Sequence, residues 1–307
     1  MNLAAIDVGT NTTLLLVVSV GDAGEIAVLA ERAEITRLGR GIGGDGRLGA
    51  EGIARTLAAL RGFADVARDH GAPIAAIGTE ALRRAPNAAD FLGPARAALG
   101  TEIEVIDGAR EAALTFRAVT ASFPELRTGG LTVVDIGGGS TEIVVAADAR
   151  VEFETSLPLG SVRLTERFIH RDPPDAAEVD ALVRAVDAAL APVPFPPGPA
   201  PLVGVAGTVT SLAAMAQGLA SYDPARVHGY RLARADLGRQ IDRLRGATQA
   251  ERERFAGLDP RRADVILAGA LILEGLARAA GAAEVLVSDR GIRWGLIYEI
   301  LESRPGA

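Results

Sequence analysis

The stretch Ala4-Ala5-Ile6-Asp7-Val8-Gly9-Thr10-Asn11-Thr12-Thr13 determines how the fold of this 307-residue chain is interpreted. It begins as an apolar run that ends in an aspartate, continues through a turn of glycine and small polar residues, and leads into a second apolar run over residues 14–20. Two apolar, β-branched runs joined by a short glycine-containing turn are typical of a β-hairpin. We therefore predict a strand, a tight turn and a second strand at the N-terminus.

The same pattern occurs a second time as Thr132-Val133-Val134-Asp135-Ile136-Gly137-Gly138-Gly139-Ser140-Thr141, followed by a strand-like run over residues 142–147. The two aspartates, Asp7 and Asp135, are about one domain length apart. A repeat at this spacing predicts two related lobes.

Between and after the two hairpins, apolar periodicity alternates between the periods of strands and helices. In the first half we expect a third strand over 25–36, helices over 50–69, 87–99 and 107–121, and strands over 73–78 and 101–106, with Asn87 capping the second helix. In the second half we expect helices over 161–170, 175–191, 209–218, 234–244, 262–280 and 291–301. This order predicts an α/β fold in which mixed sheets are flanked by helices.

Composition excludes several classes of site. The chain has no cysteine, which excludes disulfides and thiolate chemistry and agrees with a cytoplasmic location. Its three histidines, His70, His170 and His228, form no metal-spaced pair. The net charge of −7 argues against a nucleic-acid partner, and the absence of a long apolar run or a signal-like N-terminus argues against a membrane partner or secretion.

The turn after Asp135 has the residues of an anion site. We expect its three glycines to let the backbone come close to a ligand, with φ values that other residues resist, and successive N–H groups to form an anion-binding nest beside the Ser140 and Thr141 hydroxyls. Asp135 can hold Mg²⁺ against phosphate oxygens. The turn after Asp7 offers the same set. A single copy is more simply interpreted as a tight turn, but two copies at lobe spacing favour a pair of phosphate loops.

Other candidates are weaker from pattern alone. Gly207-Thr208 precede a helix, where either an anion or an ordinary cap can satisfy the first N–H groups. Glu111, near a helix start, is either a general base or a carboxylate placed by the helix dipole. Glu142 is a second candidate acid, and one of the arginines at 83–84 can clamp a phosphate or lie exposed.

Taken together, these residues are similar to those of a known family. The paired Asp-Gly turns resemble the phosphate loops of the acetate kinase, sugar kinase, heat-shock chaperone and actin superfamily. More narrowly, the chain resembles the Ppx/GppA family of exopolyphosphatases and guanosine pentaphosphate phosphohydrolases. The segments that carry this resemblance are 6–12, 78–83, 106–112, 134–142, 156–160, 204–208, 227–230 and 287–291.

The resemblance implies two actin-like, ribonuclease H-like lobes, residues 1–126 and 127–307, with the active site in the interlobe cleft. The last helix, about 291–303, is expected to pack back on the first lobe. The implied activity is Mg²⁺-dependent hydrolysis, with Mn²⁺ as an alternative metal, of the terminal phosphoanhydride of inorganic polyphosphate or of pppGpp. The implied setting is cytoplasmic, with no nucleic-acid or membrane partner, and short members of the family often form homodimers.

The resemblance also assigns roles to residues. Glu111 takes the position of the catalytic acid, and Asp135 that of the metal-associated acid, with Asp7 and Glu142 nearby. The phosphate-binding residues are implied to be Gly9, Thr10, Asn11, Arg83, Gly138, Gly139, Ser140, Thr141, Gly207 and Thr208.

The chain departs from the family pattern at two points. Many relatives have two adjacent acids before an alanine, whereas here Arg110 replaces the first and Glu111 keeps the second. Long members carry a C-terminal extension, whereas this chain resembles the short, two-domain members, and this resemblance implies short polyphosphate as the substrate. Three alternatives stay open: a kinase of the same superfamily, a sensor that binds nucleotide or polyphosphate without turnover, and a filament-forming actin relative.

Overall fold

The computed structural model describes residues 1–22, 24–42, 45–196, 198 and 200–303, which form two compact units. Unit 1 contains Met1–Leu114 and the C-terminal segment from Ile292, and unit 2 contains Thr115–Gly291. The lobe boundary expected after residue 126 differs from this division, which falls inside helix α4 (Gly108–Ser122). A continuous helix gives no composition change by which such a division can be recognised. Residues 304–307 of the predicted second lobe lie outside the described part.

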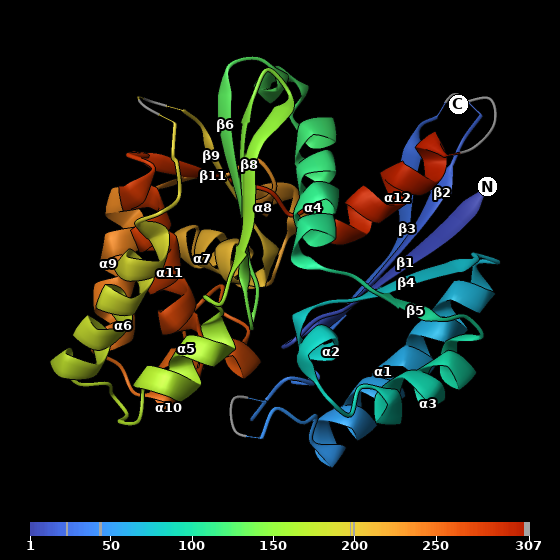
Figure 1. Cartoon of the computed structure of the whole chain (residues 1–307), viewed down its shortest axis with the longest axis horizontal. Coiled ribbons are helices and arrows are strands. Elements are labelled where there is room, and N and C mark those ends of the chain that lie inside the picture. The colour runs from blue at the N-terminus through green and yellow to red at the C-terminus, as the bar shows by residue number, and fades with distance from the viewer. Residues whose placement is uncertain (23, 43–44, 197, 199, 304–307) are drawn as a thin grey trace. The chain divides into compact units, whose positions relative to one another are not determined.

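Unit 1 is built on a five-stranded sheet with the order β3-β2-β1-β4-β5. Strands β1 (Asn2–Val8), β2 (Thr13–Val20) and β3 (Ile26–Glu34) form an antiparallel meander, and β4 (Ile74–Gly78) and β5 (Ile103–Val105) extend it in parallel. Helices α1 (Ala50–Asp69) and α3 (Ala89–Leu99) cover one face, and α12 (Ile292–Glu302) packs on β1 and β2 (Figure 1). The short helix α2 (Glu80–Arg84) follows β4 directly.

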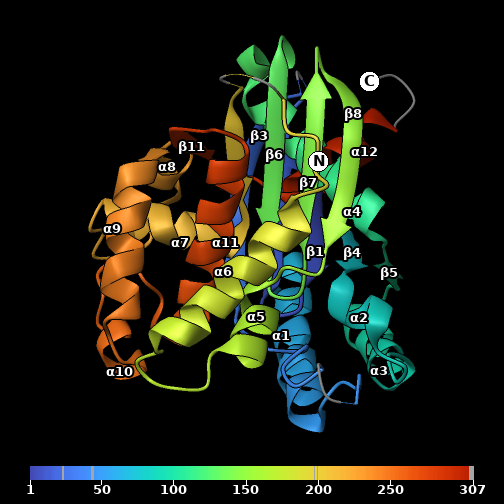
Figure 2. The ribbon, with the colours of Figure 1, turned by 60° about the vertical axis from the view of Figure 1, so that its left-hand side comes forward.

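Unit 2 contains a six-stranded sheet with the order β10-β11-β9-β6-β7-β8. Its strands are β6 (Gly130–Ile136), β7 (Thr141–Ala147), β8 (Arg150–Leu157), β9 (Leu202–Val205), β10 (Arg231–Ala233) and β11 (Glu284–Val287). Its helices are α5 (Ser161–Phe168), α6 (Ala176–Leu190), α7 (Ala206–Ala216), α8 (Pro224–Val227), α9 (Arg234–Arg245), α10 (Gln249–Arg252) and α11 (Ile266–Ala279). Figure 2 shows α11 beside α6, α7 and α9, all of which it contacts.

The two predicted hairpins have the same geometry in the two sheets. Asp7 is the next-to-last residue of β1 and Asp135 the next-to-last residue of β6. A four-residue turn follows each strand, with Val8 paired to Thr13 in the first hairpin and Ile136 paired to Thr141 in the second. The predicted fold class, with mixed sheets flanked by helices, is therefore confirmed for each unit.

Some local expectations were wrong. Asn87 does not cap α3; its amide instead exchanges two hydrogen bonds with the backbone of Leu48, at 2.8 and 3.2 Å, which ties a distant loop to this helix start. Helix α7 begins at Ala206, earlier than expected, because the helix includes the glycine turn itself. The expected helix over 262–280 begins only at Ile266, after a short 3-10 turn over Pro260–Arg262.

Each unit has a hydrophobic core of its own. In unit 1, Ile6 and Leu15 from the hairpin pack with Leu60 and Phe63 of α1. In unit 2 the core is larger because α11 is buried along almost its whole length. A fully buried aliphatic or aromatic side chain contributes roughly 1.5–3 kcal/mol to stability, so each hairpin is fixed by its own core. Of the helices that the structure describes, none is both long enough and apolar enough to cross a membrane.

Candidate functional site

The first glycine turn, in unit 1, is closed by a hydrogen bond of 3.1 Å from the Gly9 N–H to the Thr12 carbonyl. A Cβ on Gly9 would lie 2.9 Å from that carbonyl oxygen, so any other residue would push the turn open. Gly9 does not adopt a positive φ, and neither does Gly137 in the second turn. The expected φ values are therefore wrong for these two glycines. A Cβ on Gly137 would lie 3.2 Å from the Ser140 carbonyl oxygen, so close approach of the turn's own backbone favours glycine at both positions.

The carbonyl groups of the first turn are already bound on one side. Thr10 O accepts from Gly39 N and Asn11 O accepts from Arg37 N, each at 2.9 Å. In a trans peptide the following N–H points away from the carbonyl, so the N–H groups of Asn11 and Thr12 point away from this loop. The turn thus presents amide hydrogens in one direction.

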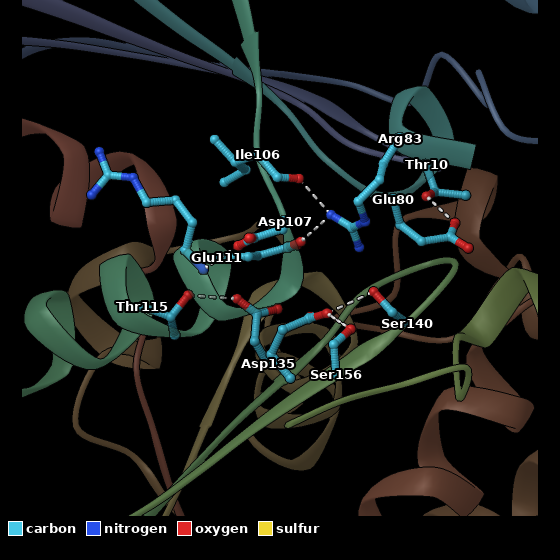
Figure 3. A network of polar contacts seen from close by, with 12 residues as sticks. Thr10, Glu80, Arg83, Ile106, Asp107, Glu111, Thr115, Asp135, Ser140 and Ser156 are labelled. Atoms are coloured by element: carbon cyan, nitrogen blue, oxygen red, sulfur yellow. Dashed lines mark hydrogen bonds and ion pairs between the residues drawn. The ribbon is translucent and has the colours of Figure 1, made fainter. Parts of the chain in front are cut away.

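Side chains of the first turn have separate roles. The Thr10 hydroxyl donates to Glu80 Oε2 at 3.3 Å, so it is held within unit 1 (Figure 3). The amide nitrogen Nδ2 of Asn11 is buried and has no hydrogen-bond partner among the described residues. Leaving a buried amide donor unpaired costs about 1–3 kcal/mol, which a bound anion would recover. Asp7 is buried at the end of β1.

The second glycine turn, in unit 2, is held in place by the N-terminus of α5. Gly137 O accepts from Ser161 N, Gly138 O accepts from Val162 N and Arg163 N, and Gly139 O accepts from Arg163 Nε at 2.7 Å. Gly160 makes this contact possible, since a Cβ there would lie 2.2 Å from the Gly138 oxygen.

This arrangement fixes the direction of the amide hydrogens. Because the carbonyls of Gly137, Gly138 and Gly139 all face α5, the N–H groups of Gly138, Gly139 and Ser140 point away from it. Successive N–H groups pointing to one side form a nest suited to a phosphate oxygen. The hydroxyl of Thr141 is not part of this nest, since it donates to Leu159 O in the same unit.

Asp135 is a buried carboxylate next to this nest. The Thr115 hydroxyl donates to its Oδ2 at 3.1 Å (Figure 3). Burial raises the pKa of Asp135 to about 6, and the hydrogen bond from Thr115 offsets this only in part. A carboxylate that is costly to ionise in isolation is suited to a cation as its partner.

Glu142, the second candidate acid, pairs with Asp135 across the hairpin. Its Oε1 accepts hydrogen bonds from Ser140 Oγ at 2.8 Å and from Ser156 Oγ at 2.6 Å. The residue is only 2% exposed. Glu142 therefore orders the second turn by holding the Ser140 hydroxyl.

Glu111 lies in the first turn of α4, where its N–H donates to Asp107 O at 3.0 Å. Its Oε2 is 3.6 Å from Nη1 of Arg83, and the same Nη1 donates to Ile106 O at 2.6 Å (Figure 3). Glu111 is 9% exposed as a whole residue. Unit 1 therefore brings together the predicted acid and the predicted phosphate-binding arginine.

The third turn begins α7. Its N-cap is Val205, which has no side chain able to cap the first N–H groups. Thr208 is buried, and the guanidinium of Arg262 lies so close that a Cβ on Gly207 would be 2.5 Å from its Nη1 and Nη2. A helix N-terminus beside a guanidinium is a favourable place for an anion.

Five residues that the pattern did not single out support these turns: Glu80, Thr115, Ser156, Arg163 and Arg262. Each contacts its partner across a stretch of chain that no local pattern spans. Glu80 and Ser156 lie inside the segments 78–83 and 156–160, and Arg163 follows the second of these, so the motifs gave a nearby signal for these three but none for Thr115 or Arg262. Within the described ranges, no three acidic or histidine side chains gather closely enough to hold a metal ion by themselves.

Comparisons with known proteins find one family over most of the chain. A model of the Ppx/GppA phosphatase family matches residues 16–304. The chain is 40% identical to Exopolyphosphatase 2 of Mycobacterium tuberculosis, over 97% of this chain and 98% of that protein. It is 32% identical to Exopolyphosphatase 1 of Mycobacterium bovis, over 99% of this chain and 89% of that protein.

Solved structures are also similar. An exopolyphosphatase from Cytophaga hutchinsonii superposes with a TM-score of 0.90 at 27% identity, covering 99% of both chains. The Ppx/GppA family member of Aquifex aeolicus superposes with a TM-score of 0.83 at 34% identity, covering 100% of this chain and 99% of that one. The family predicted from the motifs is confirmed, and this chain belongs to the Ppx/GppA phosphatase family.

Proposed function

We propose that this chain is an exopolyphosphatase, which hydrolyses the terminal phosphoanhydride of inorganic polyphosphate and releases orthophosphate. The observation that carries the proposal is the pair of matched hairpins, each with a buried aspartate and a turn whose amide hydrogens point to one side. Backbone amides bind phosphate oxygens without recognising a base or a sugar, which suits a substrate made only of phosphate. Similarity to the mycobacterial exopolyphosphatases supports the same activity.

The metal is proposed to be Mg²⁺, with Mn²⁺ as an alternative. Proteins commonly hold Mg²⁺ through one or two carboxylates, with water and substrate phosphates completing the shell, so no cluster of three acids is needed. Asp135 fits this role because it is buried, difficult to ionise alone and next to the second turn. Asp7 is the corresponding residue of the first hairpin. When bound, the metal would neutralise charge on the phosphate oxygens.

Glu111 is proposed to act as the general base. It would orient a water molecule and accept its proton while the water oxygen forms a bond to the terminal phosphorus. The bond that breaks joins this phosphorus to its bridging oxygen, and the electron pair leaves with the shortened chain. Arg83 donates from Nη1 to Ile106 O, which orients its guanidinium. The other N–H groups of this guanidinium would stabilise the charge that develops on the transferred phosphoryl group.

The proposal is tested by measuring phosphate release from polyphosphates of defined length, from pppGpp and from ATP, with Mg²⁺ and with EDTA. We expect release from polyphosphate that EDTA abolishes. Glu111→Gln, which keeps the size of the side chain, is expected to lower turnover by about 10²–10⁴-fold, since this is the usual contribution of a general base. Polyphosphate binding by the same variant, measured by calorimetry, should remain.

Each contrary result has a definite meaning. Faster release from pppGpp than from polyphosphate would make the chain a guanosine pentaphosphate phosphohydrolase. Saturable binding with no release from any substrate would make it a sensor. Normal turnover by Glu111→Gln would exclude Glu111 as the base.

A further inference from the structure

The first turn of α4 is joined to the last turn of α12 by a bidentate ion pair within unit 1. Nη1 and Nη2 of Arg110 donate to Oε2 and Oε1 of Glu299, two residues 189 positions apart in the sequence. The Arg110 side chain is 34% exposed and that of Glu299 is 26% exposed. The hydrogen bond to Glu299 raises the pKa of Arg110, so this guanidinium keeps its charge. Bidentate, partly buried pairs of this kind constrain geometry more than exposed ones do.

Both charges lie at the unfavourable end of their own helix. Arg110 is a cation in the first turn of α4, where the helix dipole favours an anion. Glu299 is an anion near the end of α12, where the dipole favours a cation. Neither residue therefore stabilises its own helix by position. The charge of Arg110 is balanced instead by Glu299 on α12 and, at 4.0 Å from its Nε, by Oε1 of Glu104.

The pair acts on the turn that carries Glu111. The backbone N–H of Arg110 donates to Asp107 Oδ1 at 2.8 Å, so Asp107 caps the start of α4. Arg110 therefore takes part both in this cap, through its backbone, and in the ion pair with Glu299, through its side chain. One turn further along, α12 meets α4 again at Gly295, where a Cβ would lie 2.0 Å from the Leu114 carbonyl oxygen. Helix α12 thus holds α4 at two levels, one on each side of Glu111 in the sequence.

We propose that Arg110 and Glu299 are positioning residues: by fixing the first turn of α4 against α12, they set the direction of the Glu111 carboxylate toward its reaction partner. This inference rests on the proposed role of Glu111 as the base.

The test is a double-mutant cycle on polyphosphate hydrolysis with Arg110→Ala, Glu299→Ala and the double variant. A misplaced base lowers kcat, so we expect kcat to fall about tenfold in each single variant while KM changes less than twofold. The double variant should be no worse than either single one, because both act through one contact. Arg110→Lys, which keeps the charge but loses the bidentate geometry, should recover part of kcat. Arg96→Ala is the matched control, since it removes the exposed Arg96–Glu102 pair of the same unit, and it should behave as the parent protein.

A second measurement does not depend on activity. Hydrogen exchange of the amides at 108–113 should be faster in Arg110→Ala than in the parent or in Arg96→Ala. If Arg110→Ala left hydrogen exchange at 108–113 unchanged, or lowered Tm without changing kcat, the ion pair would be only a structural contact. Either result would overturn the inference. If Glu111→Gln turned over normally, the role of Glu111 as the base would fail by itself, and the exchange data would still decide whether the pair orders this turn.

Discussion

Oγ1 of Thr115 lies 3.1 Å from Oδ2 of Asp135 and donates a hydrogen bond to it, which joins α4 to the end of β6 within unit 2. The bond favours the ionised carboxylate, whereas burial opposes it more strongly, and the pKa of Asp135 is raised to about 6. Asp135 is thus kept at a cost to the stability of the protein without metal, as is common for residues that serve binding.

The raised pKa of Asp135 predicts that the free energy of unfolding depends on pH. A carboxyl with a raised pKa stabilises the folded state below its unfolded pKa of about 3.8, and this contribution is lost as the pH rises through about 6. Asp135→Asn has no such titration. Without metal, the free energy of unfolding of the parent protein should therefore fall relative to Asp135→Asn between pH 4 and pH 6, by about 3 kcal/mol in total at 1.36 kcal/mol per pKa unit.

Urea unfolding of both proteins at several pH values, with EDTA, measures this difference, and the shared titrations of other groups cancel. With Mg²⁺ and polyphosphate present, the parent protein should gain stability and Asp135→Asn should not. A difference that does not change with pH would contradict the raised pKa.

Gly160 should be essential for the second turn. Its replacement by alanine would put a Cβ 2.2 Å from the Gly138 oxygen, so the turn must shift and its amide hydrogens lose their common direction. We expect turnover to fall by about 10²-fold, as for other displacements near 1 Å in a binding site. Steady-state kinetics on polyphosphate measure the effect.

Gly238→Ala in α9 is the matched control in the same unit, because a Cβ there meets no atom within 4 Å. Alanine in an open helical position should raise the free energy of unfolding by about 0.5–1 kcal/mol without loss of turnover. Normal turnover by Gly160→Ala would show that the α5 contact does not order the turn.

Arg83 should not be replaceable by lysine. Its Nη1 contacts both Ile106 O and the Glu111 carboxylate, and the planar guanidinium keeps further donors for a phosphate. Arg83→Lys keeps the charge, but its single nitrogen cannot serve all of these partners. We expect kcat/KM to fall by about 10–100-fold, or roughly 1.4–2.7 kcal/mol of transition-state stabilisation.

Arg68→Lys, in an exposed pair with Asp65, provides the comparison, and its kcat/KM should equal that of the parent protein. If Arg83→Lys were as active as Arg68→Lys, a point charge would suffice at this position, and binding of phosphate through several guanidinium N–H groups would be excluded.

Ala206 has a φ of +71° at the start of α7, directly before the third turn. A residue with a Cβ pays roughly 1–2 kcal/mol for the left-handed conformation, whereas glycine does not. Ala206→Gly should therefore raise the free energy of unfolding by about 0.5–1 kcal/mol after the added chain entropy of glycine is subtracted. Ala216→Gly, at the last position of the same helix, should lower it by about 0.5–1 kcal/mol. Thermal unfolding of the two variants distinguishes these opposite signs, and destabilisation by Ala206→Gly would contradict the strain.

The two hairpins were predictable because a hairpin is a local structure. The apolar runs that end at Asp7 and Asp135, with glycine two residues later, specify strand, turn and strand without reference to the rest of the chain. The order of strands and helices also specified the fold class in each unit. Helix starts were less predictable. Asn87 has the chemistry of a cap but bonds to Leu48 instead, since a side chain can serve a distant loop as easily as its own helix.

By itself, the sequence determined the family, the two repeated turns and the identity of the candidate acids, because these depend on residue types at short spacing. The tertiary structure alone decided what holds those residues. It brought Arg83 to Glu111, Ser156 to Glu142, the N-terminus of α5 to the carbonyls of the second turn, and Glu299 to Arg110. These contacts join segments separated along the chain, and packing of the sheets and helices rather than local propensity determines which side chains meet.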